Sequence, residues 1–410
     1  MKHINKKSVN LRFQIQNMNL YKTGIIVLCI FVHVLSAIAQ STVKRHEINS
    51  VSTAVPFLTI APDSRSSAMG DVGVATSPDI NSLHWNPAKY AFIRTEEGIS
   101  LSYSPWLRRL INDMNLLYLT GYKRIDKMQV IAASLRYFNM GSIDFRDLNG
   151  DPMTTGKPNE FALDAAYSRL FSEKISAALA FRYIRSDISS GISAYGGKAK
   201  AGNSFAADIA VYYHSDLELF DKNGTWALGA DISNIGNKMT YSNEQHKTFL
   251  PINLRIGGSA GLNLDSYNKL TFAVDFNKLL VPTPPLYNSK GEIEEGKSRD
   301  VGVVQGMFQS FSDAPGGFSE EMHEISYGLG LEYLYREIFA VRSGFFYEHP
   351  TKGNRRYFTM GVGLKTHVVG IDFSYLIATY GQNNPLNSTL RFTVIFNFGK
   401  ETKVVPEVTE

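Results

Sequence analysis

The feature that most constrains this chain is an alternation of apolar and polar residues with a period of two. Between Leu390 and Phe398 every second residue is apolar, and only Ile395 breaks the pattern. The same alternation recurs over 161–168, 205–213, 270–277, 325–336 and 369–377. Because successive side chains of a β-strand point to opposite faces, each segment is predicted to be a strand with one apolar face. The predicted fold class is all-β.

The connections between these segments alternate between short and long. Short ones are 123–126, 170–174, 265–268, 336–337 and 366–367, and long ones are 139–158, 186–201, 234–251 and 280–322. Short turns on one side and long loops on the other are typical of outer-membrane barrels, with the short side in the periplasm. We therefore predict a transmembrane antiparallel β-barrel of about 14 strands over 97–398, followed by a periplasmic tail at 399–410.

Aromatic residues gather near the predicted strand ends, as girdles at the two membrane interfaces would require. Examples are Tyr103, Tyr137, Phe138, Tyr335 and Phe346. A soluble β-sandwich also alternates, and there the aromatics would pack its core. The uneven loop lengths favour the barrel.

The first 39 residues read as a secretory signal peptide. Five basic residues and no acidic one precede or adjoin an apolar run from Gly24 to Leu35, which an Ala-x-Ala site follows at 37–39. The signal is complete from Met18 onward, so either Met1 or Met18 is the start. Cys29, the only cysteine, lies in the apolar run, and a lipoprotein reading of it suffers from the bulky Leu28 before it.

Export behind a cleaved signal changes the charge balance. The 42 Lys and Arg against 38 Asp and Glu become 37 against 38. No basic stripe remains for nucleic acid, so we expect none as a partner. We expect the mature protein to be integral to the outer membrane and to contact its lipid.

Signs of catalysis or metal binding are missing from the sequence. The histidines are scattered, and no phosphate-binding loop or Gly-x-Ser-x-Gly elbow occurs. The run 147–151 resembles part of a calcium loop, but Phe145 occupies the place of the first acid, and an Asn-Gly turn explains it better. We expect no catalytic residue, metal or cofactor, although a lipid hydrolase assembled across strands would leave no sequence signal.

Residues 40–96 precede the first strand and lack its alternation. The run RSSAMGDVGVA at 65–75, followed by LHWNPA at 83–88, resembles the N-terminal hatch of the FadL superfamily of fourteen-stranded barrels. The stretch 54–65 before it resembles the PorV family of the type IX secretion system. Candidate hatch residues are Gly70, Gly73, Trp85, Asn86 and Pro87. Turn chemistry alone would also explain them, as a plug that touches no ligand.

The long loops carry apolar residues where solvent would favour polar ones, which indicates a protein partner or a folded cap. The candidate partner-binding residues are Ile143, Phe145, Leu148, Phe308, Phe311 and Phe318.

Resemblance to the PorV family implies a binding and shuttle role. Such a barrel would capture cargo with C-terminal sorting domains from a SprA-type translocon and deliver it to a PorU-type sortase, which does the chemistry. The alternative is a FadL-type transporter of hydrophobic small molecules, which needs an apolar lumen. The inward residues Asp164, Asp208, Asp231, Asp275 and Asp372 favour the shuttle.

Overall fold

The computed structural model describes residues 48–107, 113–147, 149–191, 200–241, 247–366, 368–379, 386 and 388–401. The predicted signal peptide and its start, Cys29, Leu148 and the tail beyond Glu401 lie outside the described residues.

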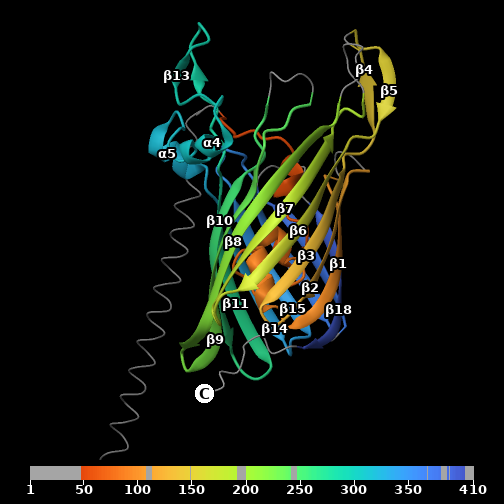
Figure 1. The fold of residues 1–410 in the computed structure, drawn as a ribbon, viewed down its shortest axis with the longest axis vertical. Coiled ribbons are helices and arrows are strands. Elements are labelled where there is room, and N and C mark those ends of the chain that lie inside the picture. Colours follow the sequence, from red (N-terminus) through yellow and green to blue (C-terminus); the bar gives the residue numbers. More distant parts are fainter. Residues whose placement is uncertain are drawn as a thin grey trace, which may run out of the picture. The chain divides into compact units, whose positions relative to one another are not determined.

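The described strands include a closed antiparallel barrel of fourteen, which confirms the predicted fold class (Figure 1). Each barrel strand pairs with its neighbours in sequence order, and β1 closes the barrel against β18. The strands are β1 (Thr95–Pro105), β2 (Asn115–Arg124), β3 (Gln129–Asn139), β6 (Asn159–Leu170), β7 (Ile175–Asp187), β8 (Gly202–Leu219), β9 (Lys222–Gly236), β10 (Asn253–Asn263), β11 (Asn268–Leu279), β14 (Ser326–Tyr335), β15 (Phe339–Tyr347), β16 (Arg356–Lys365), β17 (Val369–Ala378) and β18 (Leu390–Glu401).

The two faces of each strand differ as the alternation requires. On β1, Ile99 and Leu101 are exposed on the outer face, whereas Ser100 and Ser102 are buried inside. The Ser102 hydroxyl hydrogen-bonds Thr393 of β18 at 2.8 Å. The outer face is thus apolar for lipid, and the inner face is small and polar.

Two of the aromatic residues predicted for the girdles point inward instead. Phe138 and Phe346 are buried, whereas Tyr137, next to Phe138 in β3, is exposed. Adjacent residues of a strand face opposite sides, so only one of each neighbouring pair can reach lipid. Sequence composition near a strand end does not reveal which one.

Smaller elements lie in the long loops at one end of the barrel (Figure 1). The loop after β3 contains the hairpin β4 (Ile143–Arg146) and β5 (Pro152–Gly156). The loop after β11 contains β12 (Leu286–Tyr287), β13 (Ile293–Glu295), α4 (Val303–Gln309) and α5 (Gly317–His323). None of the helices in the described part of the chain has the length and hydropathy of a membrane span.

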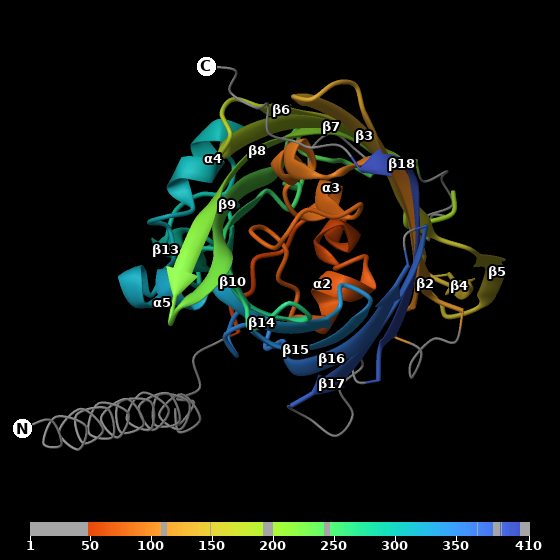
Figure 2. The same ribbon diagram turned by 90° about the horizontal axis from the view of Figure 1, so that it is seen from below.

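The segment before β1 fills the lumen (Figure 2). It consists of short helical turns, namely η1 (Pro56–Thr59), α2 (Ser64–Ala68), α3 (Ser82–Trp85) and η2 (Pro87–Phe92). We call residues 63–94 the hatch and 48–62 the strap. The strap runs to the long-loop end of the barrel, where Ala54 N–H donates to Phe249 O at 2.8 Å. Sequence reasoning treated 40–96 as one periplasmic or hatch segment and did not distinguish these parts.

Candidate functional site

The predicted hatch residues meet inside the barrel around Trp85. Its indole N–H donates to Asp63 Oδ1 at 2.7 Å, and the other oxygen of Asp63 caps α2 by accepting from Ser66 N–H at 3.0 Å. A Cβ on Gly73 would lie 2.3 Å from the Trp85 ring, so only glycine fits there. Burial raises the pKa of Asp63 to about 6, and the nearby charge of Asp79 acts in the same direction.

Two features of position 70, where the hatch meets the barrel wall, require glycine. Its φ is +73°, in the left-handed region, and a Cβ would lie 2.7 Å from backbone atoms of Leu329 and Phe345. The hatch backbone therefore lies directly against β14 and β15.

Asn86 and Pro87 form the turn that docks the hatch on β8. The Asn86 side chain accepts from Ala88 N–H at 3.0 Å and donates to Val74 O and Val211 O at 2.9 and 3.0 Å. Pro87 begins η2, where its missing N–H has no structural cost. These contacts connect the hatch turn to Val74 and to the wall of the barrel.

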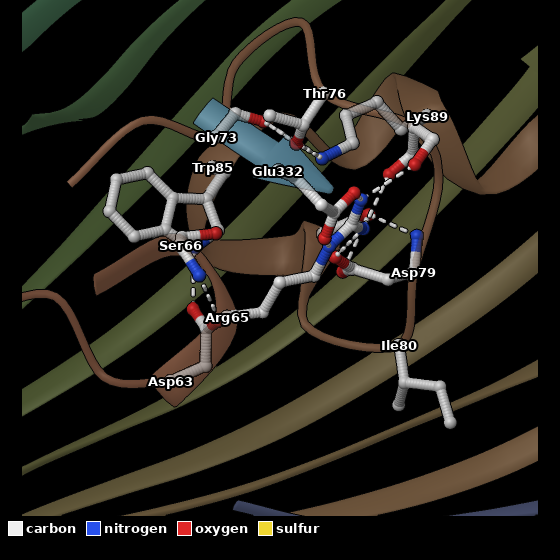
Figure 3. A network of polar contacts seen from close by, with 12 residues as sticks. Asp63, Arg65, Ser66, Gly73, Thr76, Asp79, Ile80, Trp85, Lys89 and Glu332 are labelled. Atoms are coloured by element: carbon white, nitrogen blue, oxygen red, sulfur yellow. Dashed lines mark hydrogen bonds and ion pairs between the residues drawn. The ribbon is translucent and has the colours of Figure 1, made fainter. Parts of the chain in front are cut away.

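A buried ion-pair network joins the hatch to the barrel wall (Figure 3). Arg65 pairs with Asp79 at 2.7 Å and with Glu332 of β14 at 2.9 Å. Glu332 also pairs with Arg342 of β15 at 2.6 Å. The ammonium of Lys89 donates to Gly73 O at 2.8 Å, and burial lowers the pKa of Lys89 to about 8. These contacts fix the hatch within the barrel.

A cavity of about 300 Å³ remains between the hatch, the strap and the long loops. Arg182, Arg255, Lys352, Glu324 and Glu348 are among the residues that line it. Arg182 is itself paired with Asp164 and Asp208 at 2.5 and 2.9 Å. Among the described residues no group of three or more His, Cys, Asp or Glu could hold a metal ion. The cavity is thus lined by charged side chains, several of them in ion pairs, and by apolar ones such as Leu58, Trp85 and Phe346.

The second candidate site lies on the loop that contains α4 and α5. Five of its exposed apolar side chains form what we call the outer apolar face: Val304, Phe308, Phe311, Phe318 and Met322. The exposed fractions of Phe308 and Phe318 are 75% and 77%. In contrast, Val303 and Met307 on the other side of α4 pack against a core cluster around Phe249.

The side of α5 that faces the barrel is acidic. Glu321 and Glu324 both pair with Lys278 at the end of β11, at 2.9 and 2.7 Å. Glu320 and Glu324 both pair with Lys352, at 2.5 and 2.9 Å. The usual polarity of a surface helix is therefore reversed, with charges turned inward and Phe318 and Met322 outward.

The predicted loop residues fall into two groups on opposite sides of the rim. Phe308, Phe311 and Phe318 belong to the outer apolar face, whereas Ile143 and Phe145 lie in the β4–β5 hairpin (Figures 1 and 2). Phe145 is half-buried against Gly156 of its own hairpin. The Asp147 carboxylate accepts from Asn149 and Asp151 N–H within this hairpin, in agreement with a turn at 147–151.

Sequence reasoning missed the residues that hold both sites, namely Arg65, Glu332, Lys278, Lys352 and Glu320. Their partners are distant in sequence, so no local pattern identifies the pairs. One signal was available for α5: Glu320, Glu321 and Glu324 follow one face of a helix, and Phe318 and Met322 another.

Comparison with known proteins adds a family. The chain matches the family model described as type IX secretion system protein PorV over residues 43–286, more than half of its length. No curated protein sequence matches it.

Solved structures that resemble the chain have low identity. The Pseudomonas putida toluene transporter TodX is 11% identical with a TM-score of 0.47, over 83% of this chain and 99% of that one. A Pseudomonas aeruginosa FadL homologue is 9% identical with a TM-score of 0.42, over 86% and 100%. LpxR from Salmonella typhimurium is 8% identical with a TM-score of 0.32, over 73% and 100%. The barrel fold of this chain rests on its own strand pairing.

Proposed function

The chain belongs to the PorV family of type IX secretion system proteins, and we propose that it acts there as a shuttle that binds secreted cargo. It is an outer-membrane barrel and a component of that secretion system. In the proposed role it captures proteins with C-terminal sorting domains from a SprA-type translocon and delivers them to a PorU-type sortase.

The outer apolar face is the observation that supports binding of a protein partner. Monomeric proteins rarely leave several large apolar side chains together in water, and such patches mark interaction sites. Phe308, Phe311 and Phe318 are aromatic, the side-chain class that often dominates binding energy when a partner buries it. The ion pairs on the inner side of α5 keep this face turned away from the barrel.

We propose that the protein works by affinity alone and that its partners carry out the bond-making steps. The charged groups of Arg65, Glu332 and Lys89 support this proposal, because they are engaged in holding the hatch. A transporter of hydrophobic solutes is the alternative function. It is disfavoured by the charged side chains that lie among the apolar ones in the cavity lining, since such ligands need a mainly apolar pocket.

The test is to replace Phe308, Phe311 and Phe318 together by Ser. We expect the barrel to fold, because these side chains lie outside the membrane-facing strands. Binding to a purified sorting domain or to the translocon should fall, since loss of each buried aromatic anchor costs on the order of 2 kcal/mol in a binding hot spot. A pull-down with each purified partner measures the loss.

The matched control is Phe220→Ser, because Phe220 is 73% exposed but lies in the β8–β9 turn at the other end of the barrel. It should leave binding unchanged. If the triple variant binds both partners as tightly as the unsubstituted protein, the outer apolar face is not the docking site.

A further inference from the structure

The strap connects the hatch to the long-loop end of the barrel. Next to the hatch, the strap residues Ala54, Val55, Phe57 and Leu58 belong to a buried cluster with Leu116, Phe138 and Met239. Val51 then packs against the core cluster below α4, and Ser52 O accepts from Arg299 at 2.9 Å. In Figure 1 the red segment at the start of the described chain lies at the end that carries α4, α5 and β13.

Asn49 fastens the end of the strap to three different loop segments. Its backbone N–H donates to Thr351 O at 3.1 Å. Its side-chain amide donates to Pro284 O at 3.2 Å and to Glu320 Oε1 at 3.0 Å. One residue therefore links the strap to α5 and to the segments before and after it in the chain.

The side-chain amide of Asn49 lies below α5, within a cluster of carboxylates and ammonium groups. Four carboxylates, of Asp313, Glu320, Glu321 and Glu324, lie near only two ammonium groups, of Lys278 and Lys352. Glu320 Oε1 accepts from both Lys352 and Asn49. The Asn49 amide thus adds a donor to a cluster in which carboxylates outnumber ammonium groups, and partly buried carboxylates are stabilised by such donors.

We infer that the strap lies on the cell-surface side of the membrane and holds α5 in place there, with Asn49 and Lys352 as positioning residues for the outer apolar face. The long-loop end of an outer-membrane barrel faces outward, so a segment hydrogen-bonded to three of its loop segments lies outside as well. The strap is continuous with the hatch, so the element that fills the lumen also fixes the surface helix. The positioning role rests on the proposed function, whereas the location of the strap does not.

Location is tested by labelling single cysteines on intact cells with a membrane-impermeant maleimide. Ser50→Cys in the strap should be labelled, as should Asn149→Cys in the β4–β5 turn, since both positions are exposed. Asp221→Cys in the β8–β9 turn should be labelled only after lysis. The unsubstituted protein is the blank, because Cys29 lies in the predicted signal. Labelling of Ser50→Cys only after lysis would overturn the inference.

Positioning is tested with Asn49→Ala and Asn49→Asp, with Ser50→Ala as the matched control. Asp has the shape of Asn but replaces the donor by a further carboxylate. We therefore expect amide hydrogen exchange in α5 to rise about tenfold in Asn49→Ala and more in Asn49→Asp, and to stay unchanged in Ser50→Ala. If only the shape of the Asn49 side chain mattered, Asn49→Asp would leave hydrogen exchange in α5 unchanged. Unchanged exchange in both Asn49 variants would refute the inference.

Binding of the purified translocon or sorting domain separates this inference from the proposed function. If the Asn49 variants loosen α5 and bind more weakly, both stand. If they loosen α5 without weakening binding, while the triple Phe→Ser variant does weaken it, Asn49 does not position the face. If neither kind of variant weakens binding, the proposed function fails, and the attachment of α5 by the strap stands on the exchange data.

Discussion

At the scale of single residues, the hatch depends on close approach between small and large groups. Gly73 leaves room for the Trp85 ring, whose N–H is bound by Asp63. The guanidinium group of Arg255 in β10 lies over the Trp85 ring, with its carbon 4.7 Å from the ring centroid. The indole is therefore held by a hydrogen bond and a cation–π contact, in space that Gly73 leaves open because it has no side chain. Each of these three features can be altered by a separate substitution.

Gly73→Ala should destabilise the hatch by about 1–3 kcal/mol, the usual cost of overpacking a filled interior. The added methyl group would overlap the buried Trp85 ring. The temperature at which the folded barrel changes its migration in a gel should fall. Gly302→Ala is the control, since nothing lies within 4 Å of its added Cβ. Equal temperatures for the two variants would contradict this account.

At the scale of elements, α5 is attached to the end of β11 and to the loop after β15 through titratable groups. His349, in the loop after β15, stacks on His323 at the end of α5 with ring centroids 3.6 Å apart. Burial lowers the pKa of His349 to about 4, and the charges of His323, Arg356 and Lys352 act in the same direction. The neutral imidazole is the form that packs here, so protonation should weaken the attachment.

The pH dependence follows from this shift. Detached His349 would titrate near 6.5, so between pH 6.5 and 4 the detached state binds more protons than the docked state. Attachment of α5 should therefore weaken as the pH falls through this range. Hydrogen exchange in α5 at pH 7 and pH 5 measures the effect, after correction for the intrinsic rate.

His349→Gln should remove that part of the pH dependence. Asp313 should strengthen the attachment of α5 as the pH falls, because burial raises its pKa to about 6. This contribution is present in both proteins. The difference between the two proteins thus isolates His349. An identical pH dependence with and without the imidazole would exclude His349 as its source.

At the scale of the whole molecule, the barrel is closed by backbone pairing and filled by the hatch. Closure leaves no free strand edge in the membrane, which lipid would not tolerate. Inside, ion pairs such as Arg65 with Glu332 connect the hatch to the wall. Stability of the barrel and blockage of its lumen are therefore separate properties, and the second depends on a few buried charges.

Arg65→Ala should let small polar solutes pass through the lumen, while the ring of paired strands stays closed. It leaves Asp79 and Glu332 without their shared partner, and breaking a buried pair in this way costs about 3–5 kcal/mol. Swelling of liposomes that contain the purified variant should be faster in a small sugar than for the unsubstituted protein. The exposed Arg169→Ala is the control. If Arg65→Ala instead alters only uptake of a hydrophobic solute, the transporter alternative gains support.

The sequence by itself determined the strands, the alternation of apolar and polar residues along them and the order of short and long connections. These features are local, because a period of two and turn residues act between near neighbours. The motif at 65–88 also located the hatch. The strand count followed from the same pattern and agrees with the closed barrel.

Only the tertiary structure decided which side chains meet across the molecule. Phe138 faces inward although Tyr137 faces lipid, because strand register, which long-range pairing sets, assigns the faces. Asn49 reaches Glu320, and Arg65 reaches Glu332, over sequence separations of 271 and 267 residues. A contact between residues so far apart depends on closure of the whole barrel, so neither composition nor periodicity near either partner contains it.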